Sequence, residues 1–179
     1  MTRVVVSVGT DHHPFNRMLD WLEIAQQRLD IEAVVQRGAT ADRAGIESMD
    51  YVTADELAHL MSTADAVVCH GGPGTISLAQ RSGHRPIVVA RDPALGEHVD
   101  DHQQRYTSKL AAEGHVDTAR SAEELVALLA APRPPSSRDD NDEEADRAVS
   151  QFSDLVQRLL EGNLPKRRWR DRILIRRTR

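Results

Sequence analysis

A glycine-rich loop, His70-Gly71-Gly72-Pro73-Gly74-Thr75, joins an apolar run to the start of an expected helix. Three glycines within four positions let the backbone approach a ligand closely, because no Cβ stands in the way. The following helix offers unpaired N–H groups to an anion, and Thr75 adds a hydroxyl donor. The loop is neither a P-loop, which needs Gly-Lys-Ser/Thr, nor a G-x-G-x-x-G dinucleotide turn. It is therefore a candidate anion site, although a tight turn without a ligand also fits the pattern.

A second polar loop, 96–104, concentrates carboxylates, imidazoles and amides in the run GEHVDDHQQ. Gln and Asp side chains can hydrogen-bond the hydroxyls of a sugar or a ribose, and this is the function that we favour for the loop. His98 and His102 stand four residues apart beside carboxylates, a spacing that also fits a metal site. Because much of the run looks like loop and no third ligand is obvious, we expect no metal. A solvated helix start is the remaining alternative.

A third loop, Gly9-Thr10-Asp11-His12-His13, follows a valine-rich run near the start of the chain. Gly9 allows a turn directly after the expected strand. His12 and His13 are weaker candidates, and a surface loop is the default interpretation for them.

Strands and helices alternate along the sequence, as the apolar periodicity and the turn residues indicate. Thr53 begins one helix, because Glu56 three residues later completes a capping box. Pro14 suits the first turn of another helix. The expected strands are 3–8, 31–35, an extended piece at Tyr51-Val52, Ala66–Cys69, 86–90 and Val116, and the expected helices are 14–29, one that begins at Thr53, one that ends near Arg81, 101–113 and Ala122–Ala130.

Single helices between strands predict right-handed crossovers and a parallel sheet covered on both faces. We therefore expect a doubly wound α/β domain over residues 1–130. Ligands of such sheets bind beyond the carboxyl ends of the strands, and all three polar loops lie at that edge. After this domain we expect a Pro/Ser linker at 131–141, an amphipathic helix at 142–162 and a tail at 163–179.

Composition excludes several classes of protein. The 179 residues carry a formal charge of -5 and only 3% aromatics, which argues against a polycation or a base-stacking platform for nucleic acid. Cys69 is the single cysteine, so a disulfide framework or a multi-Cys metal site is excluded. The short apolar run at the N-terminus reads as a strand rather than a signal peptide, and no run of 18 apolar residues occurs. We expect a cytoplasmic protein.

The C-terminal tail is strongly basic. From Lys166 to Arg179 the chain holds eight Lys/Arg and one Asp, a net charge of +7, whereas the remainder carries -12. Trp169 and the cluster Ile173-Leu174-Ile175 interrupt these charges. Basic and apolar residues together favour an anionic membrane surface at the inner face of the cell membrane. A solubilising end, or a strap that docks on the acidic body or on a partner, is the alternative; nucleic acid is disfavoured because the acidic body would repel phosphate.

The runs VVVSVGT, VVCHGGPGTISLA and PIVVARDPALGEHVDDHQQ resemble the C-terminal, nucleotide-sugar-binding half of family 28 glycosyltransferases. The resemblance covers about residues 3–130, and its most specific pieces are His-Gly-Gly-x-Gly-Thr and Asp-His-Gln. It implies a Rossmann-like domain of the kind that forms the C-terminal half of a GT-B glycosyltransferase. The length, without an acceptor half, resembles the soluble donor subunit of two-component transferases, whose partner is a membrane-bound acceptor-binding subunit.

The resemblance also implies roles for individual residues. Gly9 and Thr10 would lie near the diphosphate or the acceptor, and Gln36 and Gly38 near the base. The loop that begins at His70 would face the diphosphate through Gly71, Gly72, Gly74 and Thr75, and the donor sugar would be held by Asp101, His102, Gln103 and Gln104. Many members carry Glu in the helix after the glycine loop to hold the ribose, where this chain has Leu78.

The reaction implied is inverting transfer of a hexose or N-acetylhexosamine from a UDP-sugar to a lipid-linked acceptor. It needs no cofactor and no bound metal, and the general base comes from the partner, so no catalytic residue is assigned in this chain. A non-catalytic nucleotide-sugar-binding regulatory module is an alternative, supported by Leu78. A nucleotide-sugar epimerase ranks last, because one domain cannot form both walls of its cleft.

Overall fold

The computed structural model describes residues 1–132. The expected amphipathic helix at 142–162 and the basic tail at 163–179 lie outside the described residues, as does nearly all of the expected linker at 131–141.

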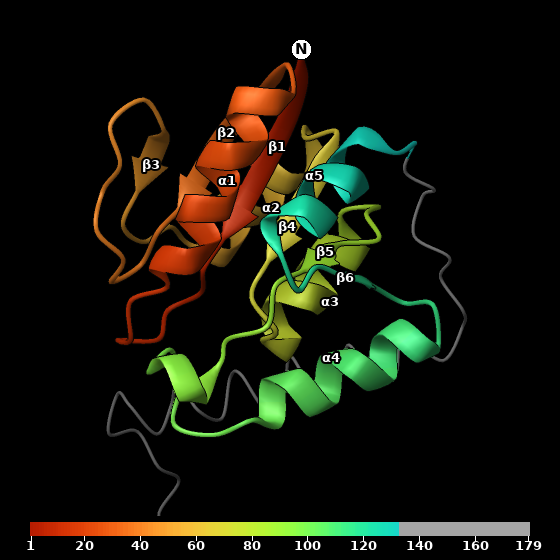
Figure 1. Ribbon diagram of the computed structural model, residues 1–179. Helices are drawn as coiled ribbons and strands as arrows, with labels where there is room; N and C mark the ends of the chain where they lie inside the picture. The colour runs from red at the N-terminus through yellow and green to blue at the C-terminus, as the bar shows by residue number, and fades with distance from the viewer. Residues whose placement is uncertain (133–179) are drawn as a thin grey trace, which may run out of the picture.

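Six parallel strands form one sheet in the order β3-β2-β1-β4-β5-β6 (Figure 1). The strand β1 lies inside this sheet, where Val5 pairs with Val34 of β2 and Val67 of β4. The predicted doubly wound parallel sheet is confirmed. The strands are β1 (Thr2–Ser7), β2 (Ile31–Gln36), β3 (Glu47–Met49), β4 (Ala66–Cys69), β5 (Ile87–Val88) and β6 (Asp117–Thr118).

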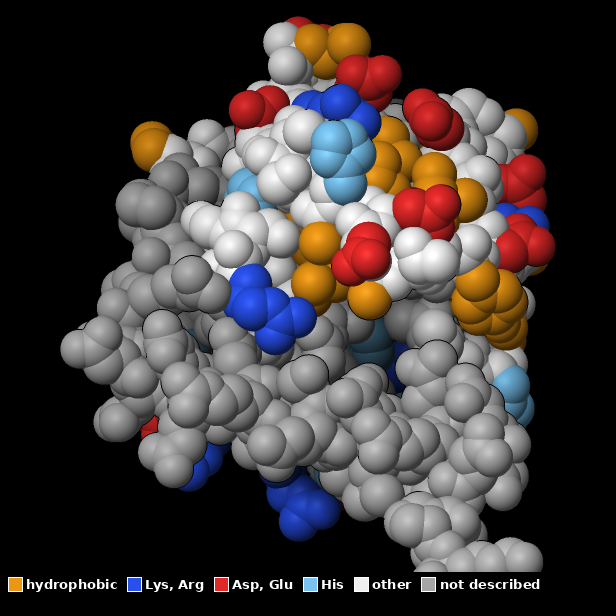
Figure 2. Space-filling view, turned by 180° about the vertical axis from the view of Figure 1, so that it is seen from behind, with side chains coloured by type: hydrophobic (Ala, Val, Ile, Leu, Met, Phe, Trp, Pro, Cys, Tyr) orange, Lys and Arg blue, Asp and Glu red, His pale blue; other side chains and the backbone are white. Residues whose placement is uncertain are grey.

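Helices cover both faces of the sheet. Helices α1 and α5 pack on one face over a large apolar cluster that includes Val4 and Val6, and α2 and α3 pack on the other face over Val5 and Val67. Figure 2 views the molecule from behind, where apolar side chains show between scattered charged ones. The helices are α1 (Asn16–Arg28), α2 (Ala54–Ser62), α3 (Pro73–Arg81), the short 3-10 helix η1 (Pro93–Leu95), α4 (His102–Ala112) and α5 (Ala122–Ala130).

Several element boundaries differ from the sequence-based expectation. The Thr53–Glu56 capping box is present as predicted. Helix α1 begins at Asn16 with Phe15 as its N-cap, so Pro14 lies before the helix rather than in its first turn. The extended piece expected at Tyr51-Val52 is replaced by β3 at Glu47–Met49, and the strand expected at Val116 begins one residue later. These strands have two or three residues, too few for apolar alternation to mark their ends.

The end of β4 is deeply buried. Cys69 packs with Ile76, Val88 and Val116 in a cluster that α4 covers through Tyr106 and Leu110. Burial raises the pKa of the Cys69 thiol to about 12. Within residues 1–132, no helix is long and apolar enough to cross a bilayer.

Candidate functional site

Three loops converge at the carboxyl ends of β1, β4 and β5, at the end of the sheet opposite the N-terminus (Figure 1). They are the loops that begin at Gly9, at His70 and at Val89. The neighbouring strand β2 adds Gln36 and Gly38 to the same edge. The predicted site residues on these loops form a chain of contacts, described below from β2 towards α4.

Gln36 holds the Gly9 loop in place. Its Oε1 accepts hydrogen bonds from Ser7 Oγ (2.7 Å) and from the Gly9 N–H (3.2 Å), and its Nε2 donates to the carbonyl oxygens of Gly9 (3.0 Å) and Asp50 (3.1 Å). These four bonds use the full capacity of the amide. Gln36 therefore positions the Gly9 loop, and its side chain is not free to contact a nucleotide base. Gly38 packs against the same turn, because a Cβ there would lie 2.6 Å from the Gly9 carbonyl oxygen.

The His70 imidazole fills the space between two glycines. A Cβ on Gly9 would lie 2.4 Å from His70 Cε1, and one on Gly72 would lie 2.2 Å from His70 Nε2. Gly9 also has φ +82°, a conformation that L side chains rarely adopt. Both glycines are therefore needed to admit a histidine ring, which is a second reason for glycine besides close approach of a ligand.

His70 is neutral at neutral pH. Burial, reinforced by the charge of Arg91, lowers the pKa of His70 to about 4. The uncharged, buried ring packs against the glycine loop. It adds no positive charge that would attract an anion.

Gly71 lies against the first turn of α4. A Cβ there would lie 2.9 Å from the Cβ of Gln103 and 3.0 Å from a methyl carbon of Thr107. Gln103 is 4% exposed, and its Oε1 is buried without a hydrogen-bond partner among the described residues. A buried amide oxygen without a partner costs free energy, so a donor from a ligand at this place would restore what the fold leaves unpaired.

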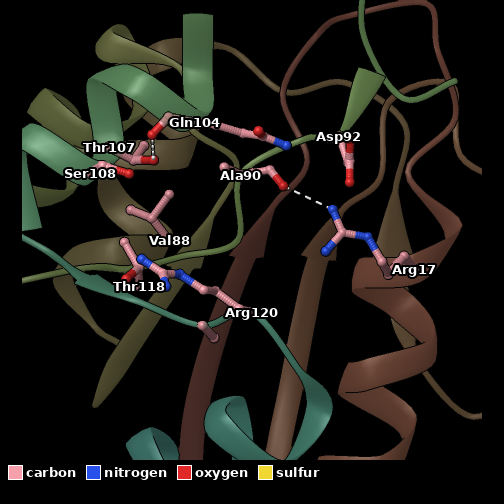
Figure 3. Close-up of a pocket in the computed structure, with 10 residues that line it drawn as sticks. Arg17, Val88, Ala90, Asp92, Gln104, Thr107, Ser108, Thr118 and Arg120 are labelled. Carbon is pink, nitrogen blue, oxygen red and sulfur yellow. Dashed lines mark hydrogen bonds between the residues drawn. The ribbon is translucent and has the colours of Figure 1, made fainter. Parts of the chain in front are cut away.

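Gln104 lines a pocket that Gln103 does not line (Figure 3). This pocket has a volume of about 340 Å³ and lies between α4, the end of β5 and the segment that follows β6. The structure therefore separates two neighbouring amides that the sequence analysis assigned to one sugar. The lining residues are Arg17, Val88, Ala90, Asp92, Gln104, Thr107, Ser108, Thr118, Ala119 and Arg120.

The remaining predicted residues lie at the same edge with fewer contacts to the others. Gly74 and Thr75 form the first turn of α3, which no side chain caps. Thr10 is exposed after Gly9. Asp101 is the N-cap of α4 and pairs with Arg105 at 3.0 Å, and His102 contacts Asp100.

Arg91 joins the loops and was missed by the sequence analysis. Its side chain is 0% exposed and donates to the carbonyl oxygens of Val8 (2.9 Å), His13 (2.8 Å) and Glu97 (2.9 Å). The guanidinium also lies 4.8 Å from the centre of the Phe15 ring. Burial lowers the pKa of Arg91 although the charges of Asp11 and Glu97 oppose this, and a guanidinium still stays charged at neutral pH. Arg91 thus fixes the Gly9 loop to the loop before α4.

A second arginine supports the same loop. Arg17 of α1 binds Glu97 with two bonds, Nε to Oε1 at 2.9 Å and Nη2 to Oε2 at 2.6 Å, and also donates to the Ala90 carbonyl oxygen at 2.8 Å (Figure 3). Glu97 Oε2 accepts the Asp92 N–H at 2.8 Å. Glu97, which the sequence analysis grouped with possible sugar contacts, is therefore a structural anchor.

Leu78 packs on the apolar cluster formed by Val5, Leu57, Met61, Val67 and Ala79. Leu78, at which the resemblance implies a ribose-binding Glu in many family members, is thus part of the contact between α3 and α2 in this chain. A carboxylate for the ribose is absent at this position.

Comparisons with known proteins identify a family and two similar folds. The family described as "Glycosyltransferase family 28 C-terminal domain" matches residues 4–159. No curated protein matches the chain significantly. Two solved structures have similar folds at 19% identity and cover 72% of this chain: the glycotransferase of kitacinnamycin (TM-score 0.55, 34% of that chain) and MurG of Acinetobacter baumannii (TM-score 0.52, 40% of that chain).

The chain therefore spans less than half the length of these solved structures. Its six-stranded parallel sheet with helices on both faces is the Rossmann-like fold of GT-B glycosyltransferase C-terminal domains. With a family match over most of its length and the glycine loop at the ligand edge of that fold, the chain belongs to the glycosyltransferase family 28 C-terminal domain family.

Proposed function

We propose that the chain is the donor-binding component of a glycosyltransferase that transfers a hexose or N-acetylhexosamine from a UDP-sugar, with inversion, to a lipid-linked acceptor. The observation that carries this proposal is the buried Gln103 Oε1, which lacks a hydrogen-bond partner among the described residues, on a residue whose Cβ packs against Gly71 of the glycine loop. A sugar hydroxyl is the type of donor that this oxygen needs.

The diphosphate would lie at the N-terminus of α3. No side chain caps this helix and its first turn holds no acidic residue. Pro73 has no N–H, so the first free backbone donors are those of Gly74 and Thr75, and a Cβ on Gly74 would meet no atom within 4 Å. Open space beside free N–H groups at a helix N-terminus suits a phosphate.

We propose that a separate, membrane-bound subunit binds the acceptor and supplies the general base. The support is the length of the chain relative to its structural neighbours, of which it covers 34% and 40%. The described residues form one domain, whereas a donor and an acceptor are enclosed between two. A non-catalytic nucleotide-sugar-binding regulatory module is the second candidate, favoured by Leu78. Transfer assays with the reconstituted pair separate the two, because only the first yields glycosylated acceptor.

The isolated chain is expected to bind UDP and UDP-sugars weakly, and Gln103→Ala is expected to weaken only the sugar contribution. Loss of one hydrogen bond of about 1.5 kcal/mol corresponds to roughly a 10-fold weaker affinity for UDP-glucose or UDP-GlcNAc, with UDP affinity unchanged. Titration calorimetry measures both ligands. Gln27→Ala, an exposed glutamine on α1, serves as the matched control.

Equal weakening of UDP and UDP-sugar by Gln103→Ala would contradict the placement of the sugar at Gln103. Absence of heat and of a thermal shift with every UDP and dTDP compound would contradict donor binding altogether. A melting curve for each variant shows whether loss of affinity reflects loss of the fold.

We further propose that the segment from Lys166 to Arg179, which lies outside the described residues, holds the protein at an anionic membrane surface. Its net charge of +7 favours such a surface by about 1 kcal/mol per basic residue. The full chain is expected to co-sediment with phosphatidylglycerol vesicles at low salt and to be released by high salt. A chain truncated after residue 162 is expected to stay in the supernatant, and equal sedimentation of both forms would contradict the proposal.

A further inference from the structure

Three side chains that suit a metal ion lie together between η1 and α4. His98, Asp100 and His102 each offer one ligand atom, and these atoms lie within 4.8 Å of one another. His98 Nδ1 is 3.8 Å from Asp100 Oδ1, and the same carboxylate oxygen contacts His102 Nδ1. The sequence spacing showed two histidines; the fold adds Asp100 between them as the third group.

We propose that His98, Asp100 and His102 bind a divalent transition-metal ion, with zinc as the preferred ion. Two imidazoles and a carboxylate are ligands that zinc accepts in four-coordinate sites, the fourth position being taken by water. Imidazole ligands disfavour Mg²⁺ and Ca²⁺, which prefer oxygen.

Asp11 contacts the far side of the His98 ring, away from Asp100. His98 Nε2 lies 3.4 Å from Asp11 Oδ2. A proton on Nε2, shared with that carboxylate, leaves the lone pair of His98 on Nδ1, where it accepts the Asp100 N–H in a long hydrogen bond of 3.4 Å that a metal ion would replace. Metal-bound histidines commonly donate their other ring N–H to a carboxylate in this way, which fixes the tautomer and the ring orientation.

Asp11 is itself held in place. Its Oδ1 accepts the His13 N–H at 2.8 Å and lies 2.6 Å from His13 Nδ1. Burial alone would raise the pKa of Asp11, but these hydrogen bonds from His13 and the charge of Arg91 lower it overall. The two contacts with His13 therefore fix the position of the carboxylate behind His98.

Exposure at the cluster suits binding from solution. The side chain of His98 is 11% exposed, whereas His102 and Asp100 are 49% and 55% exposed. One ligand is thus largely buried, and the other two lie where an ion and its water can enter. Ligand atoms around a tetrahedral zinc ion stand about 3.4 Å apart, so Asp100 and His102 must separate slightly from their direct contact.

An ion at this place would tie the start of α4 to the Gly9 loop through Asp11. The site lies beside the proposed sugar contact at Gln103 and includes His102, which the family resemblance assigns to the donor sugar. Titration with the metal ion alone, without donor, therefore tests the inference separately from the proposed function. It also reverses the expectation from sequence that no metal binds here.

Calorimetric titration of the full chain, without an affinity tag, with Zn²⁺ is the test, and Co²⁺ with its visible absorption is the spectroscopic probe. We expect one equivalent to bind and to raise the melting temperature. His98→Ala and Asp100→Ala are expected to weaken binding by about 100-fold, and Asp11→Asn by about 10-fold. His59→Ala, an exposed histidine on α2, is expected to bind like the unaltered chain.

Absence of one-to-one binding, or equal binding by the His98→Ala and Asp100→Ala variants, would overturn the proposal. Binding that falls equally in His59→Ala would also overturn it, since this indicates scattered surface histidines. The Asp100 side chain is 55% exposed and accepts its hydrogen bonds from the nearby His102, so its variant remains informative if His98→Ala fails to fold.

Discussion

Gly72→Val is expected to destabilise the fold and to abolish donor binding. The Cβ of any residue at this position would stand 2.2 Å from His70 Nε2 and 2.9 Å from Cε1. The ring has no room to move towards Gly9, because it already lies so close to Gly9 that a Cβ added there would be 2.4 Å from it. Overpacking of this kind costs about 3 kcal/mol, or about 10 °C in melting temperature. Backbone strain plays no part, because Gly72 has φ -77°.

Gly74→Ala is the matched control for this experiment. A Cβ on Gly74 meets no atom within 4 Å, and alanine in a helix is more stable than glycine by up to about 1 kcal/mol. Its melting temperature should therefore equal or exceed that of the unaltered chain. If Gly72→Val melted at the same temperature as Gly74→Ala, the packing of His70 between the two glycines would be wrong. UDP affinity, measured on the folded fraction, reports the effect on the site.

Arg91→Leu is expected to cost on the order of 3 kcal/mol or more, because two buried carbonyl oxygens and one partly buried carbonyl oxygen lose their donor. Those of Val8, His13 and Glu97 belong to two different loops. Their loss should loosen the Gly9 loop as well as the loop before α4, and donor affinity should fall with stability. Urea unfolding monitored by circular dichroism measures the first effect, and UDP titration the second.

Arg91→Lys tests the geometry of the same contact. A lysine keeps the charge but cannot present the planar fork that reaches three carbonyl oxygens, so we expect most of the destabilisation to remain. Arg28→Leu, an exposed arginine at the end of α1, is the matched control and should unfold near the unaltered midpoint. Full stability of Arg91→Lys would show that charge alone, without the fork, satisfies the loops.

The regular part of the fold could be predicted from local signals. Valine-rich runs mark β1, β2 and β4, the Thr53–Glu56 pair marks the start of α2, and Ala122–Ala130 was predicted with its observed bounds. The carboxyl-edge rule then placed the three loops together without any knowledge of distances. Strand β3 was not predicted, because its three exposed or half-buried residues show no apolar periodicity.

The polar residues that position the loops of the site could not be predicted. A single polar residue within an apolar run has no periodicity that reveals its partner. Arg91 meets Val8 across 83 residues and Gln36 meets Gly9 across 27 residues, separations over which sequence periodicity is silent. The different surroundings of Gln103 and Gln104 follow from adjacent positions on a helix, which point about 100° apart. That signal was present in the sequence and was not used.

Because Cys69 is buried, labelling of its thiol can report on opening of the fold. A thiol whose pKa is raised to about 12 yields almost no thiolate at neutral pH, and its cluster under α4 keeps reagents away. Alkylation therefore requires local opening of the C-terminal end of β4. The rate of labelling then measures how often the strand that precedes the glycine loop is exposed. As Cys69 is the single cysteine, every labelled molecule records that one event, and a bound donor would register as slower labelling.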